Sequence, residues 1–101
     1  MAKKSSIIKN SKRQKVAKQQ RAKRSKLREI ANNTNLDFEK RFIAQTKLSE
    51  LARDGSRIRY RNRCSLTGRP RGFFRKFSLS RIALRDLAAW GQIPGLTKSS
   101  W

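Results

Sequence analysis

The chain has 101 residues, of which 27 are Lys or Arg and 6 are Asp or Glu, so its formal net charge is +21. A compact protein of this charge repels itself strongly, which predicts a polyanionic partner such as the phosphate backbone of a nucleic acid. The chain contains no His and its few acids are scattered, which argues against an enzyme, and the one cysteine, Cys64, excludes an internal disulfide.

Apolar side chains are scarce. Leu, Ile, Val and Phe together number 22, close to the share below which charged chains tend to be disordered. We therefore expect little independent core and a free protein that its partner completes. There is no apolar run of about 18 residues to span a membrane and no signal peptide. A basic, acid-poor start also fits a mitochondrial transit peptide, but this start is rich in Lys and has only three Ser in its first 20 residues. A cytoplasmic location is therefore favoured, and an organelle is the alternative.

Residues 2–31 are predicted to form a long basic helix. They lack Gly and Pro, carry 12 Lys or Arg between Lys3 and Arg28, and are rich in good helix formers. Ile8, Val16 and Leu27 give only a weak apolar face. Like charges on one helix oppose its formation in water, whereas bound phosphates turn them into favourable contacts. The alternative is a solvated basic tail.

A second helix is predicted over residues 36–53, with Asn35 as its N-cap and Gly55 as its C′ residue. Phe38 and Phe42 form an i,i+4 pair, and an apolar stripe runs through Ala44, Leu48, Leu51 and Ala52. Most of the acids lie in or beside this helix, so we expect it to pack on the first helix or on a neighbouring protein. Residues 1–54 are then a basic helical extension and residues 55–101 an Arg-rich RNA-binding module.

The Arg-rich module begins with Arg57, Arg59, Arg61 and Arg63, which alternate with other residues. In a strand, all four guanidinium groups would share one face. Residues 68–72 predict an irregular loop, because Gly and Pro cluster there. A short helix is predicted over residues 79–90, with Ser78 as its N-cap and Gly91 as its end.

Arginine offers a planar fork that suits phosphate, and folded RNA is recognised through shape and base stacking. Among the aromatic residues, Phe77 and Trp90 are expected in the core and Trp101 on a partner surface. The residues predicted to contact RNA are Lys3, Lys4, Lys12, Arg13, Arg21, Arg24, Arg28, Arg57, Arg59, Arg61, Arg63, Arg69, Arg71, Arg75, Lys76, Arg81, Lys98, Ser99 and Trp101.

Four segments resemble the bacterial small-subunit ribosomal protein S-fourteen family. They are RCSLTGRPRG (residues 63–72), RKFSLSRI (75–82), GQIPG (91–95) and KSSW (98–101). The resemblance implies a protein in the head of the small subunit that binds its ribosomal RNA and aids assembly. It also implies that the protein shapes RNA near the aminoacyl-tRNA site and lies beside ribosomal proteins S-three and S-ten, with S-nineteen nearby.

Short members of this family hold zinc in a ribbon of paired Cys-x-x-Cys ligands. The matching positions here are Cys64, Thr67, Ser80 and Ala83, which have a zinc-type spacing, but only Cys64 keeps a good ligand. We therefore predict no metal and no other cofactor, as in the longer, zinc-free form of the family. Local hydrogen bonds, RNA and a small apolar cluster would stabilise the module in place of the metal. Cys64 would then be a buried residue that no longer acts as a ligand. The cluster is Phe77, Leu79, Ile82 and Leu87.

The predicted fold class is mainly α with irregular extended loops: a long basic N-terminal helix, a second helix, and a C-terminal zinc-ribbon-like module that lacks metal. Two other functions stay open on the sequence alone. One is a basic DNA-binding or nucleoid protein, with the helix over residues 78–90 in a major groove. The other is a membrane-active cationic peptide, although the sequence has no strongly amphipathic helix.

Overall fold

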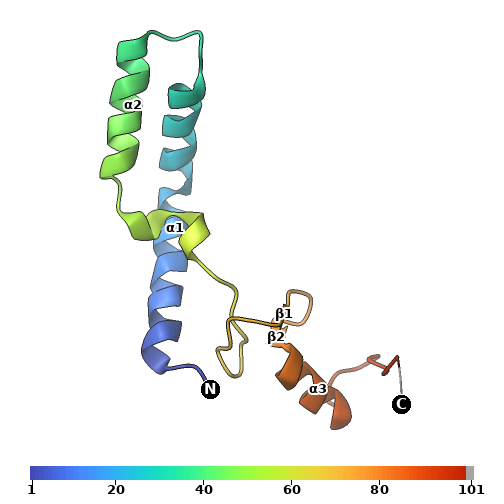
Figure 1. The fold of residues 1–101 in the computed structure, drawn as a ribbon. Helices are drawn as coiled ribbons and strands as arrows, with labels where there is room; N and C mark the ends of the chain where they lie inside the picture. The colour runs from blue at the N-terminus through green and yellow to red at the C-terminus, as the bar shows by residue number, and fades with distance from the viewer. Residues whose placement is uncertain (100–101) are drawn as a thin grey trace. The chain divides into compact units, whose positions relative to one another are not determined.

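The computed structural model describes residues 1–99 (Figure 1). In chain order these form α1 (Lys4–Asn32), α2 (Phe38–Glu50), the 3-10 turns η1 (Arg53–Gly55) and η2 (Arg57–Arg59), strands β1 (Phe73–Phe74) and β2 (Leu79–Ser80), and α3 (Arg81–Ala89). The prediction of a mainly helical protein with irregular loops is confirmed. Contacts divide the chain into two units, residues 9–60 and residues 1–8 with 61–101. The predicted boundary between the basic extension of residues 1–54 and the Arg-rich module of residues 55–101 stays a prediction.

The unit of residues 9–60 is a helical hairpin. α1 runs unbroken from Lys4 to Asn32, as predicted for a segment without Gly or Pro, and α2 returns antiparallel along its C-terminal part (Figure 1). The Asn33 side chain accepts a hydrogen bond from the Asn35 backbone N–H at 3.0 Å, which closes the connecting turn. Arg41 of α2 donates to the backbone oxygen of Ala31 at 3.2 Å. Ala44, which is 4% exposed, is the buried residue of α2.

α2 is shorter than predicted at both ends. Its N-cap is Asp37, whose side chain makes no capping hydrogen bond, and the N–H of Asn35 donates to the side chain of Asn33 in the preceding turn. The prediction of Asn35 as the cap is therefore wrong. The helix ends in extended backbone at Leu51, and Gly55 belongs to η1 instead of terminating α2. A Cβ atom on Gly55 would collide with the side chain of Gln20, so this glycine allows η1 to lie close to α1.

The strand suggested by the alternating arginines does not form. Residues 57–59 make the turn η2, and residues 60–64 are irregular. The Oδ1 atom of Asp54 lies 3.2 Å from Nε of Arg13 and 2.9 Å from Nη1 of Arg59. This shared carboxylate holds η2 against α1. The one sheet among residues 1–99 is formed later in the chain by two other short strands, so no strand is available to pair with residues 57–63.

The other unit is built around a small core. Cys64, Leu79 and Ala83 are buried, and Phe77, Leu84, Leu87 and Ile93 pack against them. Ile82 was expected in this cluster but is 49% exposed and does not pack against it. The antiparallel pair of β1 and β2 pairs Phe73 with Ser80 and Phe74 with Leu79. This hairpin was not predicted, because two residues per strand are too few for an alternating pattern.

The sequence predicted the C-terminal end of α3 correctly but not its N-cap. Ser80 caps the helix, and Ser78, the predicted cap, instead has a φ of 55° in the turn before β2. Gly91 ends the helix as predicted: its N–H donates to Ala88, and the Gln92 N–H donates to Leu87, which is the Schellman arrangement. Trp90, predicted to be in the core, is 74% exposed.

The first residues of the chain belong to the same unit as the C-terminal part. The Ala2 N–H donates to the Thr67 oxygen at 3.1 Å. Ile7 packs against Gly68, which has a positive φ.

No helix among residues 1–99 is long and apolar enough to cross a membrane.

Candidate nucleic-acid interface

The predicted RNA-binding residues of α1 fall into two classes. Lys12, Arg21 and Arg28 are exposed, and none of them pairs with a carboxylate of residues 1–99. Arg13 instead binds Asp54. Arg24 donates to the Ala52 oxygen at 2.7 Å and to the Gln20 side chain at 3.3 Å, so it fastens the segment after α2 onto α1. Lys3 and Lys4 are exposed at the start of the chain.

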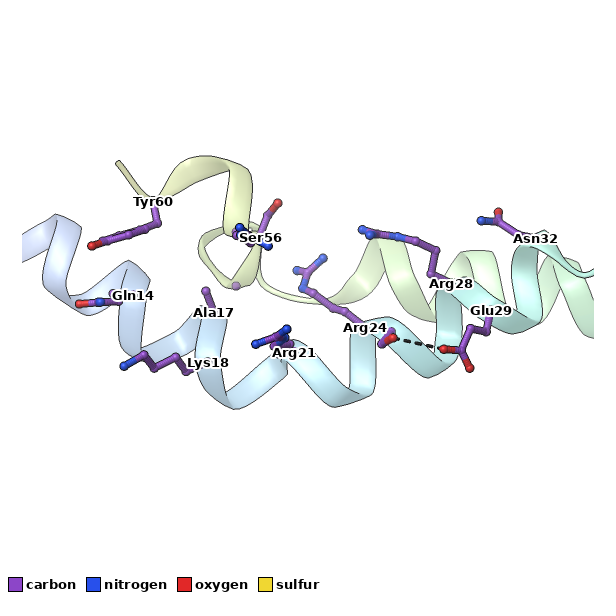
Figure 2. Close-up of a pocket in the computed structure, with 13 residues that line it drawn as sticks. Gln14, Ala17, Lys18, Arg21, Arg24, Arg28, Glu29, Asn32, Ser56 and Tyr60 are labelled. Atoms are coloured by element: carbon purple, nitrogen blue, oxygen red, sulfur yellow. Dashed lines mark hydrogen bonds between the residues drawn. The ribbon is translucent and has the colours of Figure 1, made fainter. Parts of the chain in front are cut away.

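A basic groove lies between α1 and the segment of η1 and η2 (Figure 2). Its volume is about 780 Å³. Tyr60 lines it, and so does Lys18, which was not among the predicted contact residues. Lys18 was detectable from the sequence, because it lies three residues before Arg21 on the same helical face. The lining residues are Gln14, Ala17, Lys18, Arg21, Arg24, Ser25, Arg28, Glu29, Asn32, Gly55, Ser56, Arg57 and Tyr60.

Three of the predicted arginines of the Arg-rich module hold its loop in shape. Arg61 donates to the Pro70 oxygen at 3.0 Å, and Arg63 donates to the Gly68 oxygen at 2.9 Å. Arg69 donates to the Arg71 oxygen at 3.2 Å. These side chains turn back onto carbonyl groups of residues 68–71, so part of each fork is already used within the protein.

The remaining predicted residues of this module are at the surface. Arg71, Arg75, Arg81 and Lys98 are exposed, as is Ser99. Lys76 is also exposed, with its Nζ 5.6 Å from the centre of the Phe77 ring. A second cavity of about 640 Å³ brings Arg81, Lys98 and Ser99 together with Arg85, which was not predicted. Trp101 lies outside the described residues.

The four positions expected to match zinc ligands differ in burial: Cys64, Ser80 and Ala83 are buried, and Thr67 is partly buried. Burial raises the pKa of the Cys64 thiol, but hydrogen bonds from the Thr67 hydroxyl and from the backbone of Thr67, Ser80 and Leu66 outweigh it and lower the pKa to about 6. Ala83 donates its N–H to Ser80 Oγ and packs in the same cluster as Cys64.

This donor set does not fit a structural metal. Residues 1–99 contain no group of three or more His, Cys, Asp or Glu that would hold an ion. A structural zinc site takes four such ligands, and Cys64 is the single thiolate at these positions.

Comparison with known proteins identifies the family. Residues 47–100 match the sequence profile described as ribosomal protein S14p/S29e. The chain is 59% identical over 101 residues to small ribosomal subunit protein uS14 of Rhodospirillum centenum, covering all of both chains. It is 60% identical over 102 residues to the protein of that name from Wolbachia pipientis of Culex pipiens and 56% identical over 101 residues to that of Maricaulis maris, again covering all of each chain.

The chain belongs to the ribosomal protein S14p/S29e family. This confirms the resemblance predicted from residues 63–101 and the prediction of a structural protein of the ribosome instead of an enzyme. The profile of the S14p/S29e family begins at residue 47, so it covers the Arg-rich module but not α1. The full-length identity to the bacterial relatives extends the match to the basic helix.

Proposed function

We propose that this protein is a structural constituent of the small ribosomal subunit that binds the small-subunit ribosomal RNA in the head and aids its assembly. The observation that carries the proposal is full-length identity of about three-fifths to proteins named as small-subunit components. The net charge of +21 and the exposed cations of both units support RNA as the main partner.

The mechanism is neutralisation of charge combined with recognition of shape. Exposed cations of α1 and of the Arg-rich module contact phosphates and release condensed counterions. The loop of residues 68–72 presents a fixed, irregular surface, because Arg61 and Arg63 hold its carbonyl groups. Such a surface suits RNA junctions and bulges near the aminoacyl-tRNA site, which proteins recognise by shape.

The C-terminal unit acts as a zinc-ribbon-like module without metal. The hydrogen bonds that join Cys64, Thr67 and Ser80 take the place of the ion, and the cluster of Leu79, Ala83 and Leu87 supplies the apolar contacts. This preserves the position of the RNA-binding loop without a cofactor.

α2 is the part of the protein best suited to contact neighbouring proteins. Its Phe38 and Phe42 rings stack with centroids 6.1 Å apart and are 76% and 60% exposed. The two rings form an exposed apolar surface, so they fit the predicted contacts with ribosomal proteins S-three and S-ten, and S-nineteen nearby. The location is the ribosome of the bacterial cytoplasm, with an organellar ribosome as the alternative.

Sedimentation tests this function directly. A tagged copy in a bacterial host should migrate with the small subunit through a gradient at moderate and high salt. Cross-linking within purified subunits should then join it to head RNA and to the proteins named above. A protein that stays at the top of the gradient, or that migrates with chromosomal DNA, would overturn the proposal in favour of the DNA-binding alternative.

RNA binding by the Arg-rich module is tested with matched charge removals. Arg71→Ala with Arg75→Ala removes two exposed cations from this module, whereas Lys40→Ala with Lys47→Ala removes two exposed cations from α2. The first pair should flatten the logarithmic dependence of RNA affinity on salt by about 0.7–0.9 per charge. The second pair should change it less. Equal effects of the two pairs would show that total charge alone governs binding.

A further inference from the structure

The basic groove of residues 9–60 follows one face of α1. The lining residues Gln14, Arg21, Arg28 and Asn32 recur at helical spacing, and η1 and η2 form the opposite wall (Figure 2). From Gln14 to Asn32 the helix rises ~27 Å, at about 1.5 Å per residue. The volume of about 780 Å³ falls within the range of roughly 300–1,000 Å³ typical of sites for small organic ligands. The groove therefore accepts a narrow, elongated ligand.

The charges of this groove are strongly one-sided. Lys18, Arg21, Arg28 and Arg57 line it, and none of them pairs with a carboxylate among the described residues. The one acid in the lining, Glu29, accepts a hydrogen bond from Ser25 at 3.3 Å, marked by the dashed line in Figure 2. Unneutralised cations close to each other repel one another, so the groove favours an anionic ligand.

One end of the groove differs in chemistry from the rest. The ring of Tyr60 lies there beside Gln14, and Ala17 is the neighbouring small residue on α1 (Figure 2). Tyr60 is partly buried, so part of the residue remains accessible to a ligand. An aromatic face next to amide and hydroxyl groups suits a planar heterocycle with polar edges.

We propose that this groove binds an unpaired segment of RNA, with its phosphates on Lys18, Arg21, Arg28 and Arg57 and one base stacked on Tyr60. The proposal rests on the proposed function and assigns the form of RNA that α1 recognises. Gln14 lies beside Tyr60 and carries an amide that can donate to or accept from the edge of a stacked base (Figure 2).

An unpaired strand fits this groove better than a duplex does. In an A-form helix the bases are stacked and paired, so no base face is available to Tyr60. A groove that combines a cationic track with an aromatic platform is the usual way in which proteins hold single strands without reading their sequence. An acidic peptide would satisfy the cations but leave the Tyr60 ring without a planar partner.

Binding of short oligonucleotides to the full-length protein tests the proposal. The probes are a mixed-sequence single-stranded RNA of about eight nucleotides, an RNA duplex of the same length and a poly-glutamate peptide. Tyr60→Leu removes the ring but keeps apolar volume, and should weaken single-strand binding about 5- to 100-fold. Tyr60→Phe, which keeps the ring, should bind within about two-fold of the parent. The duplex should be nearly unaffected by either change.

The cationic track is tested with Arg21→Gln combined with Arg28→Gln. These changes should flatten the salt dependence of single-strand binding by about 1.4, since each phosphate contact contributes about 0.7. Lys15→Gln on α1 with Lys47→Gln on α2 is the matched control, because both residues are exposed, lie outside the groove lining and have no ion pair among residues 1–99; it should have a smaller effect. Unchanged single-strand affinity in Tyr60→Leu, or tighter binding of poly-glutamate than of RNA, would overturn the proposal.

Sedimentation of the parent protein, compared with single-strand binding by Tyr60→Leu, separates this proposal from the broader function. If the parent protein fails to enter the small subunit, the proposed function is wrong. If the parent enters the subunit and Tyr60→Leu binds single strands normally, only the assignment of the groove is wrong.

Discussion

The Oγ atom of Ser80 accepts a hydrogen bond from the backbone N–H of Ala83 across 3.3 Å. Both residues occupy positions that would carry ligands in a zinc ribbon, and Cys64 lies in the same buried cluster as Ala83. The hydrogen bond caps α3, so Ser80 fixes the start of the helix. A metal site and a helix cap are thus alternative ways to hold one stretch of chain.

Restoring three cysteines should therefore create a zinc site. With Thr67→Cys, Ser80→Cys and Ala83→Cys, four thiolates would stand at the zinc-ribbon spacing, and the protein should bind one tetrahedral zinc ion, measured by competition with a metal-sensitive dye. The control adds Cys64→Ser to the same variant and should bind zinc much more weakly. Weak binding that is independent of Cys64 would show that the four positions do not converge as a ribbon.

The Cys64 thiol should titrate far below an ordinary cysteine. Its pKa of about 6 in the folded protein, against 9.0 as the ordinary value, means that folding favours the thiolate. Because the folded-state pKa is the lower one, this contribution to stability is fully present above about pH 9 and is lost as pH falls through about 6. Ultraviolet absorbance of the thiolate against pH measures the folded value, and the same titration in denaturant gives the reference.

Cys64→Ser is the control for that titration. It should abolish the absorbance change and reduce the dependence of stability on pH between about 6 and 9. A titration midpoint near the ordinary cysteine value in the folded protein would contradict the hydrogen bonding of the thiol by Thr67 and Ser80.

Loss of the Ser80 cap should loosen α3. Ser80→Ala removes the acceptor of the Ala83 N–H, and caps of this kind contribute about 0.5–2 kcal/mol. Amide hydrogen exchange of Ala83 measures the effect, which should be faster exchange in the first turn of α3. Ser99→Ala, which changes an exposed serine of the same unit, should leave it unaltered.

Ser78 should tolerate glycine and resist branched residues. At a φ of 55° it is the one non-glycine residue of the described chain with a positive φ, a conformation that disfavours a Cβ atom. Ser78→Gly should keep or raise the thermal midpoint, whereas Ser78→Val should lower stability by at least ~1 kcal/mol. A Ser78→Val protein as stable as the parent would contradict the turn geometry between β1 and β2.

The sequence predicted the elements that depend on local preference and missed those that depend on distant contacts. α1 follows from a long run of helix formers without Gly or Pro, and the end of α3 follows from Gly91. The alternating arginines suggested a strand, because nothing in the local pattern shows that Arg59 would bind Asp54 or that Arg61 would bind Pro70. Serine favours both caps and turns, so Ser78 and Ser80 were not distinguishable from sequence.

The candidate interface shows the same division. The cationic residues were predicted from composition, but their separation into structural and free groups requires contacts: Arg13 and Arg24 are used within the fold, whereas Arg21 and Arg28 line the groove. Tyr60 joins that groove only because η2 turns back toward α1, which local sequence does not determine.

Removing the shared carboxylate of Asp54 should have opposite effects on stability and on RNA binding. Asp54→Asn breaks the ion pairs with Arg13 and Arg59, which are partly exposed, so the cost in stability should be modest, at most ~1 kcal/mol. The freed arginines should bind RNA more tightly at low salt and steepen the salt dependence. Amide exchange of Tyr60 reports the loosening of η2, and filter binding across a salt series reports affinity.

Asp86→Asn is the control, because it changes the net charge equally at an exposed residue of α3 that forms no ion pair among the described residues. It should shift RNA affinity less and leave the amide exchange of Tyr60 unchanged. If the two variants gave the same exchange rate at Tyr60, Asp54 would not be what holds η2 on α1.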